Sequence, residues 1–242
     1  MTITYQFSDG KGLDESFSVD LDNPGPADDS DLPSWTALEF HQCDNCPLSA
    51  NEHERCPAAV ALVDLLPISE KVWSYDELTV EVITPERTIS QETSAQRAVS
   101  ALMGMLLAAS NCPMLAIFQP MVRFHLPFAS RDETVYRVLS MYALAQYFHK
   151  QQGEDVDVDF EALAEMYKEI QVVNRSLASR LRTAATTDAS TNAIAILDTF
   201  AQTIPFVIED SLTDLEELFE PYLNAVTRMH EARSASNSVQ DR

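Results

Sequence analysis

The sequence predicts an α+β protein: a small N-terminal antiparallel β-sheet with a cysteine-rich loop, packed on a bundle of about five α-helices. Before residue 90, apolar residues alternate with polar ones in several short segments, which is the period of a strand with one buried face. From residue 91 onward they recur at helical spacing. A run of strands followed by a run of helices is typical of α+β architecture. The 242 residues, 45% of them apolar, suffice for a sizeable core.

Two hairpins are predicted in the N-terminal third. Every second residue is apolar in residues 3–7 and 17–21, and the turn-forming residues 8–12 join them. Residues 78–82 and 88–90 form a second pair around a Pro-Glu turn.

The segment between the hairpins holds a linker, a strand and a helix. Residues 22–33 combine prolines with aspartates, which indicates an exposed linker. Leu38 and Phe40 alternate with polar neighbours and predict a strand that runs into Cys43. Pro57 suits the first position of a helix, because its missing N–H would have no partner there.

The first two long helices are predicted over residues 94–110 and 135–149. The former is apolar nearly all round in its second half, as in a buried central helix. Ser130 and Glu133 have the spacing of a capping box before the latter.

Three further helices are predicted towards the C-terminus. Asp159 is expected to cap the first, whose apolar stripe runs to Leu181. The others cover residues 194–205 and about 206–229, the last broken near Pro221.

The expected organisation is a sheet with its cysteine loop over residues 1–90, a helical bundle over 91–230, and a flexible tail over 231–242. We expect the first two parts to fold as one cooperative unit, tied together by Cys112.

Charge and hydropathy exclude several classes of partner. The formal net charge of −22, from 38 acidic and 16 basic residues, repels nucleic acids and anionic membranes. The longest apolar stretch, residues 98–109, is shorter than the roughly twenty residues that span a bilayer. The N-terminus has no features of a signal peptide. We therefore expect a cytoplasmic protein without nucleic-acid or membrane partners.

The motifs of several enzyme classes are missing. The five glycines form no phosphate-binding loop and no nucleophile elbow, and the histidines form no HExxH motif. The sequence therefore favours a non-enzymatic protein, although a catalytic triad assembled only in space would leave no such trace.

The most specific pattern is a set of four cysteines, which predicts a metal site on Cys43, Cys46, Cys56 and Cys112. A Cys-x2-Cys pair lets two sulfurs converge on one ion from a tight turn. Zinc is the expected metal. An iron–sulfur cluster uses the same ligands, and four buried reduced cysteines without metal are the third interpretation.

Histidine and arginine residues supply weaker candidates. His41 or His53 could replace one thiolate. Arg87, Arg97, Arg123 and His125 could form a positive pocket for an anion, although solvated or ion-paired side chains are the favoured interpretation.

A second polar group lies on one predicted helix. It is expected to be a solvated helix face, and its members are Asn174, Arg175, Arg180 and Arg182.

Four segments resemble an uncharacterised family of bacterial proteins, a domain of unknown function. They are WTALEFHQCDNCPL at 35–48, TPERT at 84–88, RFHLP at 123–127 and YRVLSMYALAQYF at 136–148. The resemblance spans most of residues 1–220 and implies a bacterial, cytoplasmic setting. It assigns no catalytic residue.

We therefore expect a non-enzymatic, metal-stabilised regulatory or protein-interaction module whose partner is a protein with a basic patch. The alternative is an iron–sulfur redox protein or sensor.

Overall fold

The structure, a computed structural model, describes residues 1–22 and 31–240, so most of the predicted linker lies outside the described residues. The chain divides into two compact units, Met1–Pro205 and Phe206–Arg242. The features that follow belong to the first unit unless stated.

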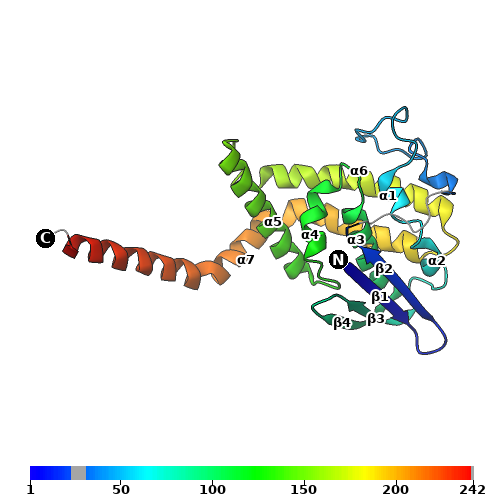
Figure 1. The fold of residues 1–242 in the computed structure, drawn as a ribbon, viewed down its shortest axis with the longest axis horizontal. Coiled ribbons are helices and arrows are strands. Elements are labelled where there is room, and N and C mark those ends of the chain that lie inside the picture. Colours follow the sequence, from blue (N-terminus) through cyan, green and yellow to red (C-terminus); the bar gives the residue numbers. More distant parts are fainter. Residues whose placement is uncertain (23–30, 241–242) are drawn as a thin grey trace. The chain divides into compact units, whose positions relative to one another are not determined.

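The predicted α+β class is confirmed, and both hairpins join in one antiparallel sheet of order β2-β1-β3-β4 (Figure 1). The strands are β1 (Thr2–Ser8), β2 (Asp14–Asp20), β3 (Glu77–Ile83) and β4 (Thr88–Ser94). Tyr5 lies opposite Val82 and Phe7 opposite Val80, and all four side chains are buried. The alternation in the sequence therefore produces the buried face of the sheet.

The strand predicted over Leu38 and Phe40 is wrong. A short 3₁₀-helix, η1 (Ser34–Thr36), is followed by turns, and among the described residues this segment pairs through an isolated bridge between Ala37 and Arg55. The carbonyl groups of Ala37 and Leu38 accept hydrogen bonds from the Arg180 side chain, so they are not available to a neighbouring strand.

The expected helix start at Pro57 is confirmed, but the helix is short. It forms α1 (Pro57–Val60), and after a turn the chain forms α2 (Leu66–Ser69). The central helix α3 (Ala95–Ala109) is largely buried and packs on β3 and β4. After α3 come η2 (Ala116–Phe118) and α4 (Gln119–Arg123).

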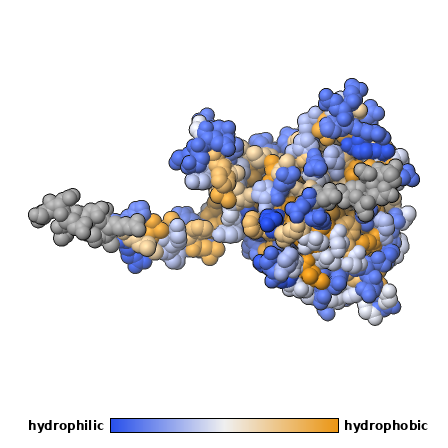
Figure 2. Space-filling model, in the orientation of Figure 1, coloured by the Kyte–Doolittle hydropathy of each residue, from blue (hydrophilic) through white to orange (hydrophobic). Residues whose placement is uncertain are grey.

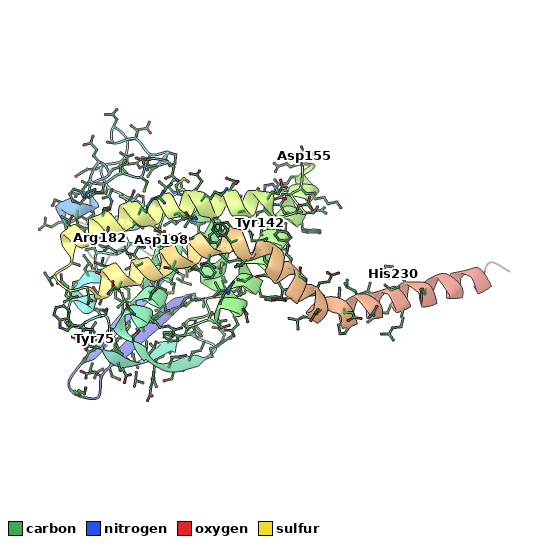
Figure 3. The ribbon with its side chains drawn as sticks, turned by 180° about the vertical axis from the view of Figure 1, so that it is seen from behind. Tyr75, Tyr142, Asp155, Arg182, Asp198 and His230 are labelled. Carbon is green, nitrogen blue, oxygen red and sulfur yellow. The ribbon has the colours of Figure 1, made fainter. Side chains whose placement is uncertain are left out.

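Helix α5 (Arg131–Gln152) begins at the predicted capping box. The Ser130 hydroxyl accepts the Glu133 N–H, and the Glu133 carboxylate accepts the Ser130 N–H. In its middle the Tyr142 hydroxyl donates to Asp157 at 2.7 Å (Figure 3).

The expected cap of α6 (Glu161–Ala184) is wrong. The N-cap residue is Phe160, in the left-handed region with φ of 61°. The carboxylate that accepts a helix N–H belongs to Asp157 instead of Asp159, and its donor is Ala162. Asp157 thereby joins the start of α6 to Tyr142 on α5.

The two C-terminal helices that the sequence predicted are one helix, α7 (Ala189–Gln240), with Pro205 and Pro221 inside it. Its first part, within the first unit, runs beside α6 (Figure 1), and Gln171 donates to the carbonyl of Ala201 at 3.2 Å. The described helix passes residue 231, where a flexible tail was expected. Residues Ala189–Ile208 are long and apolar enough to cross a membrane by length and composition, a test that core helices also pass.

Candidate functional site

The four cysteines come from three parts of the first unit. Cys43 and Cys46 lie in the loop after η1, Cys56 is the N-cap residue of α1, and Cys112 lies in the turn after α3. All four are free thiols. Cys56 and Cys112 are buried, and the other two are half-buried.

The loop that carries Cys43 and Cys46 is closed at its base by backbone hydrogen bonds. Cys56 donates to the carbonyl of Thr36 at 2.8 Å, and Leu38 donates to that of Glu54 at 2.9 Å. Within the loop, the Cys46 N–H donates to the Cys43 carbonyl at 3.0 Å, which closes the tight turn expected of a Cys-x2-Cys pair.

Arg180 of α6 holds this loop. Its guanidinium donates to the carbonyl groups of Trp35 and Ala37, both at 2.7 Å, and of Leu38 at 2.9 Å. It also lies 5.9 Å from the centre of the Phe40 ring. With 1% of its surface exposed, Arg180 is not part of a solvated helix face, so that expectation is wrong for this residue.

Sequence spacing contained a signal for the burial of Arg180. It follows Leu177 by three residues and Val173 by seven, and both are buried in the apolar stripe of α6. Asn174 is also buried, whereas Arg175 and Arg182 are exposed as expected.

The structure brings three of the cysteines into electrostatic range of Arg180, and it brings Cys112 into range of two of those three. Cys43, Cys46 and Cys56 each interact electrostatically with the Arg180 guanidinium. Cys112 interacts electrostatically with Cys56 and Cys43. Tertiary structure thus brings Cys112 near Cys56 and Cys43 across a long separation in sequence.

Two thiols have raised pKa values. Burial raises the pKa of Cys112 to about 11, against the backbone N–H groups of Met114 and Leu115, which lower it. Burial also raises the pKa of Cys43, and a hydrogen bond with Ser176 opposes it. Both groups are therefore protonated at neutral pH, and a bound cation would have to displace their protons.

The cysteines are close but do not form a finished metal site. Among the described residues, no group of three or more His, Cys, Asp or Glu side chains is arranged to hold a metal ion. His41 and His53 are both exposed. One observation does fit an anionic group here, because the buried Nε of Arg180 has no hydrogen-bond partner.

The structure brings together two members of the second candidate group, Arg97 and His125, but not Arg87 or Arg123. Arg87 and Arg123 are exposed, and the ring of His125 is hydrogen-bonded to the Tyr5 hydroxyl. Arg97 and His125 both line a cavity, which is described below.

Comparison with known proteins places the chain in a family. No curated protein and no solved structure matches it. One family model matches residues 1–220, which is most of the sequence and includes all four cysteines and Arg180. The chain therefore belongs to the family described as Domain of unknown function (DUF6901).

Proposed function

We propose that this protein is a non-enzymatic protein-interaction module whose N-terminal loop is stabilised by a zinc ion on Cys43, Cys46, Cys56 and Cys112. The observation that carries the proposal is the buried cation beside the thiols. Burying a charge without an opposite charge is costly, and a buried arginine therefore normally has an anionic partner. Within the described part of the chain, no carboxylate lies at ion-pairing distance from Arg180, and the thiols are the groups that act on its charge.

A four-thiolate zinc site supplies the missing negative charge. Four thiolates around one Zn²⁺ carry two net negative charges, and the guanidinium offsets one of them. The unpaired Nε–H of Arg180 is a donor for a thiolate sulfur. Cys43 and Cys46 lie in a loop without helix or strand, so these two sulfurs can move toward Cys56 and Cys112 without unfolding a regular element.

A closed shell of four protein ligands also favours a structural role over catalysis. Catalytic zinc keeps one position open for water or substrate, whereas four cysteines leave none. Figure 2 shows hydrophilic residues interspersed with apolar ones on this face, and acidic residues outnumber basic ones by 38 to 16 in the whole chain. A protein with a basic surface patch is the matching partner.

Metal analysis of the full chain, purified without oxygen or added metal, tests the metal site. We expect one zinc per chain and four thiols that react only after a chelator is added. A brown sample with iron would replace zinc by the iron–sulfur alternative. Metal-free protein with four freely titrated thiols would contradict both.

The Cys46→Ser variant tests whether the metal stabilises the fold. Structural zinc contributes an apparent binding free energy of about 10–16 kcal/mol, so the melting temperature should fall by about 10 °C or more. His53→Ala, an exposed side chain in the same loop, is the control and should melt like the wild type. Equal melting temperatures and metal contents for wild type and Cys46→Ser would show that the thiols are only packing residues.

The interaction role is tested by affinity capture of partners over a range of salt concentrations. A partner held by its basic patch should be retained at low ionic strength and released as salt is raised. Salt-independent capture, or turnover of a small molecule by the purified chain, would contradict the proposal.

A further inference from the structure

A cavity of about 340 Å³ lies within the first unit, among α3, α4, α5, α6 and the first part of α7. This volume is in the range of small-molecule binding sites. Most of its wall is apolar, with side chains from every one of these helices and the adjoining turns. Representative residues are Met105, Leu115, Val138, Ile170, Leu197 and Phe200.

Three buried polar side chains interrupt this apolar wall. Ser100 is 5% exposed, Tyr167 2% and Asn174 3%, and all three line the cavity. Among the described residues these side chains make no hydrogen bond, and their polar atoms are not fully buried, so they face space in the cavity that water or a ligand can fill. Polar groups that line a mostly apolar pocket fix the orientation of a bound molecule. These three side chains can therefore bind polar groups of a ligand, or water that accompanies it.

Two arginines give the cavity a positive charge. Arg97 of α3 is exposed and lines the cavity, so it is accessible from solvent. Arg137 of α5 is half-buried, and its Nη2 donates to the carbonyls of Phe124 at 3.0 Å and Met121 at 3.4 Å. In the described part of the chain, neither forms a salt bridge within 4.0 Å, and the carboxylate of Glu133, one turn before Arg137 on α5, acts on the Arg137 charge from farther away.

His125 adds a neutral polar group to the same wall. Burial and the nearby Arg137 charge lower the pKa of His125 to about 4, so its ring is uncharged at neutral pH. It is hydrogen-bonded to the buried Tyr5 hydroxyl. The positive charge of the cavity therefore comes from the two arginines.

We propose that this cavity binds a small monocarboxylate with an apolar body. The carboxylate pairs with Arg97 and the free nitrogens of Arg137, since a guanidinium matches the planar geometry of a carboxylate. The body lies against the apolar helix faces, and Ser100, Tyr167 and Asn174 bind polar substituents of the ligand or waters that accompany it. A cation is repelled by the arginines, and a neutral apolar molecule gains no charge-assisted hydrogen bond from them.

Calorimetric titration of the full chain with octanoate, and separately with naphthoate, tests this site. One molecule should bind per chain, and comparison of the two acids distinguishes an aliphatic from an aromatic body. Octanamide has the same chain length but no charge. It should bind the same site about tenfold more weakly than octanoate, because it lacks one charge-assisted hydrogen bond.

Three variants locate the binding. Arg97→Gln should weaken octanoate about tenfold and leave octanamide unchanged. Arg87→Gln is the matched control, because Arg87 is exposed and does not line the cavity. Ala101→Phe places a ring in the cavity and should abolish binding of both ligands. Gly104→Ala is a milder alternative, because the new Cβ would lie 3.4 Å from Leu197 Cδ2, an ordinary contact.

Several results would overturn the proposal. No saturable binding of either carboxylate is one, and equal affinity for octanoate and octanamide is another. Wild-type affinity in a folded Ala101→Phe variant would place the ligand elsewhere. If Ala101→Phe does not fold, unchanged binding by Gly104→Ala together with unchanged binding by Arg97→Gln leads to the same conclusion.

Discussion

The cysteine end and the cavity end of the first unit are built on the same two helices but use buried polar groups in opposite ways. Near Cys112, which follows α3, Arg180 of α6 makes three hydrogen bonds to backbone carbonyls of one loop. Beside the cavity, the side chains of Ser100 on α3 and Asn174 on α6 are also largely buried but make no hydrogen bond to another described residue. Buried polar groups anchor the chain at one end, and at the other we propose that they bind a ligand.

Removing the Arg180 guanidinium should have the largest effect in this comparison. Arg180→Met leaves three carbonyls without this donor, two of them buried, and should lower the free energy of unfolding by about 3–5 kcal/mol, as measured by urea denaturation. Arg182→Met, at an exposed neighbour on α6 (Figure 3), should change it by less than about 0.5 kcal/mol. Equal losses would mean that Arg180 does not anchor the loop.

Raising the pH into the alkaline range should lower the stability of metal-free protein more than that of zinc-loaded protein, by less than the effect of Arg180→Met. A thiol whose pKa is raised in the folded state stabilises the fold fully when the pH is below the pKa of the unfolded state. This contribution is lost as the pH rises through the pKa of the folded state. For Cys112 that window runs from 9.0 to about 11. Metal-free protein should therefore lose about 1–2 kcal/mol more than the zinc-loaded form across this window. Melting curves of the two forms would check this, and parallel pH profiles would contradict it.

The smallest expected effect is at the cavity. Asn174→Leu removes an amide with no partner, so stability should stay the same or rise by about 1 kcal/mol while octanoate binding weakens. Asn192→Leu is the matched control, because its amide donates to Asp188 at 3.1 Å, and it should lose about 1 kcal/mol. If Asn174→Leu is destabilised as much as Asn192→Leu, its amide has a structural role in the fold. Urea denaturation and calorimetry measure the two quantities.

Features governed by local pattern could be predicted from the sequence. The hairpin strands, the central helix α3 and the capping box at Ser130 depend on neighbouring residues whose spacing can be read directly. Cys112 was associated with the other cysteines by residue type alone, and the fold does bring it into their electrostatic range.

Features governed by distant partners could not be predicted. The strand expected at Leu38 does not form because its carbonyl is hydrogen-bonded to Arg180, a residue 142 positions away. Pro205 indicated a helix end, yet α7 continues through it, because a long helix can accommodate a proline. The cavity escaped detection because its polar residues lie on different helices and share no motif.

The long separation between Leu38 and Arg180 has a consequence for biosynthesis. The ribosome synthesises about 5–20 residues per second, so Arg180 is made about 7–30 s after Leu38, the loop residue that it anchors. During that interval Cys43, Cys46 and Cys56 have left the ribosome while the anchor on α6 has not been made. The nascent chain must therefore pass through a stage in which three thiols are exposed to oxidants and to the metal ions of the cell before the fold can select among them.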